Sequence, residues 1–203
     1  MERASVGLSA EVCVLLSPSA AFRQLATEPR GDWWVLVRRP LLLAFMFGCT
    51  VSLQASGRLT TRLITDGAIS FAFVPIFEGA ALAAVYWRRP RQLPFAQTVD
   101  IFFAANAPWL VWLLAFGVLR CLQSPLQAAA PPPVIQWLVR SSLVATVAWS
   151  AYVDLHFFRE ILPRPAGGSS HDLILQRAIA WVCIVVYFLG YALWPEIIGR
   201  IPA

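Results

Sequence analysis

The residues best suited to chemistry are charged and polar side chains that interrupt long apolar runs. Glu78 lies in AFVPIFEGAALAA, and Asp100 and Asn106 lie in TVDIFFAANAPWLVWLL. If these runs cross a membrane, a charged side chain near the centre costs about 2.5–3.5 kcal/mol on insertion scales. Each such residue therefore needs a partner, access to water or a function. Four more residues raise the same question: Asp66, Arg140, Asp154 and Arg177.

The depths of these residues predict two layers of ion pairs. Depth is counted from the ends of each apolar run at about 1.5 Å per residue. Asp100, Asp154 and Arg177 fall in one layer near the inner ends of their runs, so Arg177 could neutralise Asp154 or Asp100. Asp66 and Arg140 fall in an outer layer and could neutralise each other. We therefore predict that Asp154, Arg177, Asp66 and Arg140 form structural pairs that fix the order of the helices.

Glu78 is the deepest of the acidic residues, and the count gives it no basic partner. Two states are open: a protonated carboxyl, because an apolar surrounding disfavours the charge, or a hydrogen bond to Asn106 across the bundle. Glu78 follows Pro75 and precedes Gly79, a pattern found in broken helices at transport sites and in tightly packed proline kinks alike. Glu78 thus remains a candidate polar site, with Asp100 and Asn106 beside it.

The sequence lacks the common motifs for metal binding, nucleotide binding and nucleophilic catalysis. The four cysteines are far apart without a CxxC pair, and no P-loop, GxGxxG, HExxH or GxSxG occurs. His156 lies near the end of an apolar run and His171 in a loop, so the axial pair of a transmembrane haem is missing. We expect no enzymatic activity, no metal and no cofactor, and a pigment held through one histidine is left open.

Composition places the chain among integral membrane proteins. Hydrophobic residues make up 59% of the 203 residues and charged residues only 13%, against about 25% in an average globular domain. The mean hydropathy is +0.66. We predict an all-α, single-domain bundle of five transmembrane helices over 39–203, after a cytoplasmic segment over 1–38. Each predicted span reaches roughly the 20 residues that a bilayer requires: 39–56, 63–87, 95–120, 134–158 and 173–195.

Arginine placement predicts the orientation. All sixteen basic residues are arginine, which suggests a GC-rich bacterial genome and hence the bacterial inner membrane. Eleven of them lie on one side of the predicted spans: Arg3, Arg23, Arg30, Arg38, Arg39, Arg88, Arg89, Arg91, Arg159, Arg164 and Arg177. Because arginine-rich loops stay cytoplasmic, the N-terminus is expected inside and the C-terminus outside. This asymmetry accounts for the basic charge without a nucleic-acid partner.

Before the first span, LLSPSAAFRQLATEP predicts a short amphipathic helix. Ser17 stands at the N-cap position and Pro18 at the first helical position. Phe22 and Leu25 share an apolar face, and Arg23 lies on the polar face. Two placements, which do not exclude each other, are open: the helix lies on the inner leaflet, where it could also bind a partner, or it packs beneath the bundle as an intramolecular cap.

Three segments resemble a known family. SPSAAFRQLATEP, RRPLLLAFMFG and LPFAQTVDIFFAANAPWLVWLL are similar to bacterial members of the Yip family of five-span membrane proteins. The resemblance covers residues 17 to about 120 and the last two spans only by topology. It implies a five-helix bundle with a cytoplasmic N-terminus. Eukaryotic members of that family are associated with trafficking GTPases and membrane shaping.

The leading functional hypothesis is a membrane scaffold or accessory subunit without enzymatic chemistry. It would lie in the lipid bilayer and pack against other membrane proteins or a second copy through small-residue faces such as EGAALAA. The first alternative is a small proton- or cation-coupled transporter or channel component that uses Glu78. The second is a membrane recruiter that binds a soluble partner through the helix over 17–30.

Overall fold

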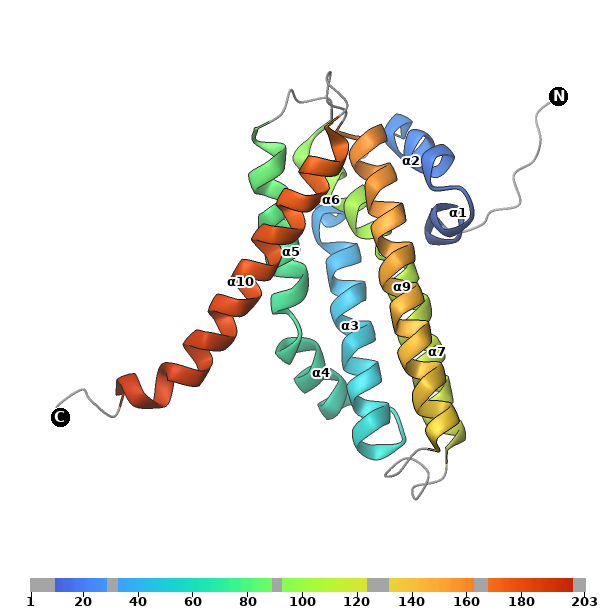
Figure 1. The fold of residues 1–203 in the computed structure, drawn as a ribbon, viewed down its shortest axis with the longest axis vertical. Coiled ribbons are helices and arrows are strands. Elements are labelled where there is room, and N and C mark those ends of the chain that lie inside the picture. Colours follow the sequence, from blue (N-terminus) through green and yellow to red (C-terminus); the bar gives the residue numbers. More distant parts are fainter. Residues whose placement is uncertain (1–9, 29–32, 89–92, 124–131, 163–167, 199–203) are drawn as a thin grey trace.

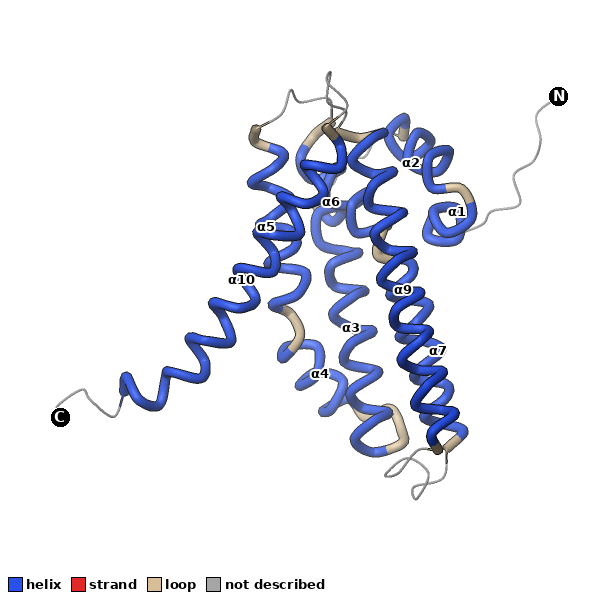
Figure 2. Tube along the Cα trace, viewed as in Figure 1, coloured by secondary structure: helices blue, strands red, loops and turns tan. Residues whose placement is uncertain are grey.

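A computed structural model describes residues 10–28, 33–88, 93–123, 132–162 and 168–198, and every regular element in these residues is helical (Figures 1 and 2). The predicted all-α fold is therefore confirmed. The helices follow each other as α1 (Ala10–Leu16), α2 (Pro18–Thr27), α3 (Trp34–Ser56), α4 (Thr61–Ser70), α5 (Phe73–Tyr86), α6 (Phe95–Ala104), α7 (Ala107–Leu122), α9 (Pro133–Glu160) and α10 (Ser169–Ile198).

Three helical stretches are long and apolar enough to cross a membrane. They are Trp34–Ser56, Thr61–Tyr86 and Ser169–Ala192, and α6 with α7 makes a fourth if this pair, bent by 43°, counts as one span. By the same measure α9 is not a candidate, because its 28 residues include Arg140, Asp154 and several polar side chains between the apolar ones. The composition of the described helices thus supports a membrane protein with three or four candidate spans.

Proline explains the interruptions in two of these stretches. The α-helix is interrupted by a turn at Phe71 and Ala72, shortly before Pro75, and by another at Ala105 and Asn106, shortly before Pro108. A proline cannot donate the backbone hydrogen bond that would continue the preceding helix. Figure 2 shows the first interruption as a short loop between α4 and α5. Glu78 consequently lies in the second turn of α5, beyond the break.

The first two long stretches touch so closely that glycine is required at their crossing. A Cβ atom on Gly48 of α3 would lie 2.2 Å from the carbonyl oxygen of Ile64 in α4. Gly67 of α4 faces the same point, because its Cβ would lie 3.0 Å from the Cα atom of Gly48. Close backbone approach of this kind is how small residues join membrane helices.

Substituting Gly48→Ala is expected to lower the free energy of unfolding by about 1–3 kcal/mol, the usual cost of an overpacked contact. The added methyl group meets backbone, which cannot move aside like a side chain. The matched control is Gly190→Ala in α10, where a Cβ has no neighbour within 4 Å. Denaturant unfolding in detergent measures both variants, and equal stability of the two would contradict the close crossing.

A cluster of buried aromatic side chains lies at the end of the bundle where α2 meets α6 and α9. Phe22, Phe102 and Phe157 are buried there with at most 1% of their surface exposed. The ring of Phe157 makes edge-to-face contacts with Phe22 at 5.9 Å and with Phe102 at 5.3 Å. Aromatic pairs at this distance and geometry stabilise a core beyond the area they bury.

Helix α2, the amphipathic helix predicted before the first span, packs against the bundle as an intramolecular cap. Phe22 is fully buried and Leu25 is 4% exposed, so neither is available to a bilayer or a partner, and their assignment to such a surface was wrong. Of the three predicted contact residues, only Arg23 is exposed. Its Nη1 lies 3.8 Å from Oε2 of Glu160 and forms an ion pair with it. The amide of Gln97 in α6 holds the end of α2, donating to the backbone oxygens of Leu25 and Glu28. Pro18 begins the helix as predicted, although the Ser17 side chain makes no capping hydrogen bond.

Helix α10 leans away from the rest of the bundle. Near its beginning it packs against α9, and Tyr187 and Phe188 farther along contact Phe73 of α5. Figure 1 shows α10 (red) diverging from α9 (orange) toward the C-terminal end. The two helices therefore meet near one end of the molecule and open toward the other.

Candidate functional site

The first polar centre, which we name the Asp100 cluster, consists of Asp100, Arg38, Arg39 and Glu11. Both carboxylate oxygens of the fully buried Asp100 accept hydrogen bonds from Arg38, at 2.7 and 2.6 Å. Arg39 donates to the Asp100 carboxylate and to its backbone oxygen, and its Nε donates to Glu11 at 2.9 Å. Two positive and two negative groups thus join α1, α3 and α6, and the two-point contact of Arg38 is the strong form of such a pair.

The Asp100 cluster was missed at the sequence level. Arg38 and Arg39 were counted as loop arginines because the first span was predicted to begin at residue 39, whereas α3 begins at Trp34. The helix therefore carries both guanidinium groups alongside α6. In the sequence, the adjacent arginines followed by Pro40 were the one pattern that could have indicated this cluster. Nothing in the sequence indicated that Glu11 belongs to it.

The second polar centre, which we name the Arg177 cluster, consists of Arg177, Glu78, Asp154, Asn106 and Ser150. Nη1 of Arg177 donates to Glu78 at 2.7 Å, and Nη2 donates to Asp154. Asn106 approaches the other oxygen of Glu78 at 3.5 Å, at the long limit of a hydrogen bond. Ser150 donates to Asp154 over 3.4 Å. The cluster brings together α5, α9, α10 and the residue that precedes α7.

The structure brings some of the predicted site residues together and separates others. Of the alternatives left open, the structure pairs Arg177 with Asp154 and brings Asn106 to Glu78. The expectation that Glu78 has no basic partner was wrong, because one guanidinium reaches both Glu78 and Asp154. Asp100 lies in the other cluster and is not beside Glu78 as a shared site would need.

The outer pair of Asp66 and Arg140 is not formed. Asp66 lies 3.8 Å from Arg62 on its own helix, and the side chains of both are mostly exposed. Arg140 is exposed on α9. Helices α4 and α9 lie on opposite sides of α3 (Figure 1), so a common depth does not bring the two residues within reach.

The Arg177 cluster carries more negative than positive charge. Its two carboxylates face one guanidinium, so its net charge is −1 when all three groups are ionised. The side chains of Asp154 and Glu78 are 3% and 13% exposed, and that of Arg177 is 27% exposed. Removing one partner from such a buried group leaves an uncompensated charge and is strongly destabilising.

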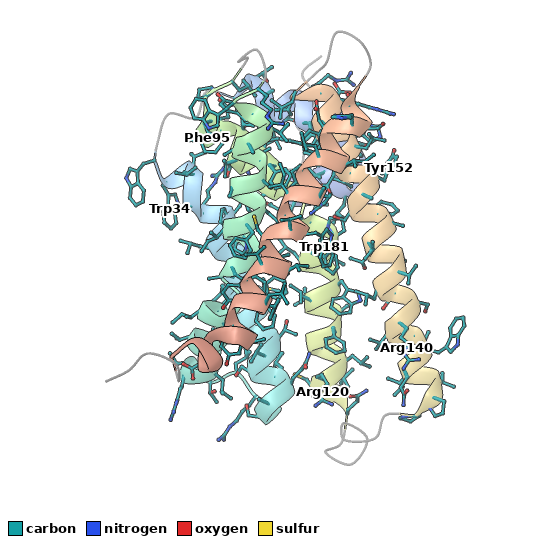
Figure 3. All side chains as sticks on the ribbon, turned by 60° about the vertical axis from the view of Figure 1, so that its left-hand side comes forward. Trp34, Phe95, Arg120, Arg140, Tyr152 and Trp181 are labelled. Carbon is teal, nitrogen blue, oxygen red and sulfur yellow. The ribbon has the colours of Figure 1, made fainter. Side chains whose placement is uncertain are left out.

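A cavity of about 550 Å³ adjoins the Arg177 cluster. Glu78, Asn106, Ser150 and Arg177 contribute its polar wall. The remaining wall is mainly apolar and includes Phe47, Trp109, Leu143, Val147, Trp181 and Ile184. It lies where α9 and α10 begin to diverge, and Figure 3 places Trp181 of α10 at mid-height of the bundle.

A smaller cavity, of about 340 Å³, lies at the end of the bundle where α3 and α7 end and α9 begins. Arg120 and Arg140 border it together with three glutamine side chains, and Figure 3 shows both arginines at that end. Its polar residues are close to the helix ends, where water would solvate them in a membrane.

Within the described ranges, no three histidine, cysteine or carboxylate side chains are placed to hold a metal ion. His156 lies 2.6 Å from the Ser19 hydroxyl and contacts the ring of Tyr152. The four cysteines, all in described segments, are free thiols. The Arg177 cluster and its cavity are therefore the strongest candidate site.

No family model matches this chain, and no curated protein or solved structure matches it either. Any function must consequently be argued from the geometry above.

Proposed function

We propose that this chain is a five-span integral membrane protein that acts as a non-enzymatic scaffold or accessory subunit. The observation that carries the proposal is the Arg177 cluster, whose charges pair with one another across α5, α9 and α10. Buried charge used in this way fixes which helices are neighbours and how they are rotated. Membership of the Yip family and a bacterial inner membrane with the N-terminus inside are parts of the same proposal.

Three features support α9 as the fifth span: the length of the helix, the pairing of its charged residues and its path along the bundle. Its 28 residues correspond to about 42 Å at the usual helical rise, more than the roughly 30 Å of a hydrocarbon core. Asp154 is neutralised by Arg177, and Arg140 is close enough to the helix start to extend toward water. Figure 1 shows α9 running along the bundle beside α3 and α7.

The surface for a partner membrane protein would lie on α9 and not on EGAALAA of α5. Ala81 and Leu82 of that segment are fully buried within the protein, so this face is already used. In contrast, Leu138, Val144 and Trp149 of α9 are at least half exposed. Apolar surface of this kind suits lipid or another membrane helix.

Gentle-detergent extraction followed by sizing and mass spectrometry tests the scaffold proposal. We expect the protein to be recovered in fixed stoichiometry with another membrane protein or with a second copy. Replacing Ala145 on the exposed face of α9 with tryptophan should weaken this association. The matched control is Ala192→Trp on exposed α10. Recovery as a monomer only would contradict the proposal.

A second candidate is a proton- or cation-coupled transporter, favoured by the cavity beside two carboxylates that share one guanidinium. Substituting Glu78→Gln separates the two functions. The scaffold proposal predicts unchanged assembly and a modest loss of stability, because the amide keeps most of the hydrogen-bonding capacity. Proton and monovalent-cation flux into vesicles is the deciding measurement. Wild-type flux that disappears in a folded Glu78→Gln protein would contradict the scaffold proposal.

The recruiter hypothesis loses its basis in this structure. It requires the apolar face of α2 to be free, and Phe22 and Leu25 are buried against the bundle. Deleting residues 1–30 would therefore expose core residues such as Phe157.

A further inference from the structure

We propose that the cavity beside the Arg177 cluster binds a single-chain amphiphile with a primary-amine head. The site would hold the ammonium group against Glu78 and the tail against the apolar wall. This proposal is independent of the scaffold function, since a scaffold and a transporter could both hold such a molecule. Its support comes from the size of the cavity, its lining and the hydrogen-bonding groups that remain open.

The cavity has the dimensions and lining of a ligand site. Its volume of about 550 Å³ falls inside the range of roughly 300–1,000 Å³ typical of small-molecule pockets. Such pockets are mostly apolar with a few convergent polar groups, and here the polar groups gather at the Arg177 cluster. This division into an apolar part and a polar part matches an amphiphile.

The charges favour a cationic head over an anionic one. Arg177 already faces two carboxylates, Glu78 and Asp154, so an anionic head would enter a cluster whose negative charge exceeds its positive charge. A single positive charge instead brings the cluster from −1 to zero. The two tryptophans in the wall, Trp109 and Trp181, also suit a cation, because indole faces attract positive charge.

Acceptor capacity remains at the site, beside N–H groups of Arg177 that make no bond within the described residues. Oε2 of Glu78 receives only the long contact from Asn106, and the carbonyl oxygen of that amide can accept as well. A primary ammonium group supplies three donors. A phospholipid head would bring its phosphate toward the two carboxylates, which disfavours it.

Binding is measured by quenching of tryptophan fluorescence in the full-length protein in phosphatidylcholine nanodiscs. The probes are an alkylamine, an alcohol and a carboxylate with the same brominated chain. We expect the amine to bind about tenfold or more tightly than the alcohol, the weight of one hydrogen bond to a charged group, and the carboxylate most weakly. The quenching should decrease in Trp181→Phe. Equal binding of the amine and the carboxylate would overturn the proposal, as would better binding of phosphatidylethanolamine than of the amine.

Two pairs of variants locate the site. Glu78→Gln should reduce amine affinity about tenfold while the alcohol is unaffected. Val147→Phe fills the cavity without touching the ionic groups and should abolish binding of the amine and the alcohol alike. Val144→Phe, on the same helix but 69% exposed and outside the cavity, is the matched control and should bind normally. Identical binding by Val147→Phe and Val144→Phe would show that the amphiphile lies elsewhere and reject the proposed site.

Discussion

Replacing Asp100 with asparagine is expected to lower the free energy of unfolding by about 3–5 kcal/mol, the cost of leaving a buried charge without its partner. The carboxylate is fully buried and accepts from both Arg38 and Arg39. In the variant, the two adjacent guanidinium groups would lose the carboxylate that they share, and Arg39 would keep its pair with Glu11. Denaturant unfolding in detergent, followed by circular dichroism, measures the loss.

The control for this prediction is Asp66→Asn. Asp66 also faces an arginine, but the pair is 3.8 Å apart and mostly exposed. Exposed pairs of this kind contribute about 0–1 kcal/mol. Similar losses in Asp66→Asn and Asp100→Asn would show that burial of the Asp100 cluster does not stabilise the fold.

Replacing Arg177 with methionine is the second change with a large expected effect. It should lower the free energy of unfolding by about 3–5 kcal/mol. The substitution leaves Glu78 and Asp154 close together in a largely buried site without a cation. Loss of the guanidinium should release α10 from α5 and α9, which it joins, and the repulsion between the two carboxylates should push α5 and α9 apart. Proteolysis of α10 in the folded protein should increase together with the loss of stability.

A rescue experiment separates loss of charge balance from loss of packing. The triple variant Arg177→Met, Glu78→Gln, Asp154→Asn has no charge left in the cluster. Because neutral replacement of a whole buried ionic group is often tolerated, its stability should return most of the way to wild type. A triple variant as unstable as Arg177→Met alone would mean that the arginine acts through packing.

The sequence predicted features that depend on one helix at a time. Apolar runs located the long helices, and the serine and proline at Ser17 and Pro18 located the start of α2. Counting depth also paired Asp154 with Arg177, because both lie within a few turns of the same end of the bundle.

Features that depend on which helices are neighbours were not predictable in the same way. Depth is one coordinate, and it says nothing of the order of helices around the bundle. Asp66 and Arg140 share a depth but lie on helices separated by α3, whereas Asp100 pairs with Arg38 and Arg39 because α6 crosses α3. The reach of arginine added a second error, since Arg177 extends to Glu78 as well as to Asp154.

The position of α2, either on the inner leaflet or against the bundle, also depends on which elements are neighbours and could not be read from the sequence. An amphipathic pattern identifies an apolar face but not what covers it. In the structure that face is covered by α9 and α6, through Phe157 and the neighbouring core.

The central claim is that α9 crosses the membrane and brings Asp154 to Arg177 and Glu78. Cysteine labelling in intact cells tests it most directly, in a background lacking the four native cysteines. Reporter substitutions go at exposed residues beside the helix ends: Leu59→Cys, Trp87→Cys, Leu122→Cys and His171→Cys. With five spans, an impermeant maleimide should label the reporters at Leu59 and Leu122 from outside and the other two only after lysis. Labelling of Leu122→Cys and His171→Cys from the same side would show that α9 does not cross, and would contradict the account.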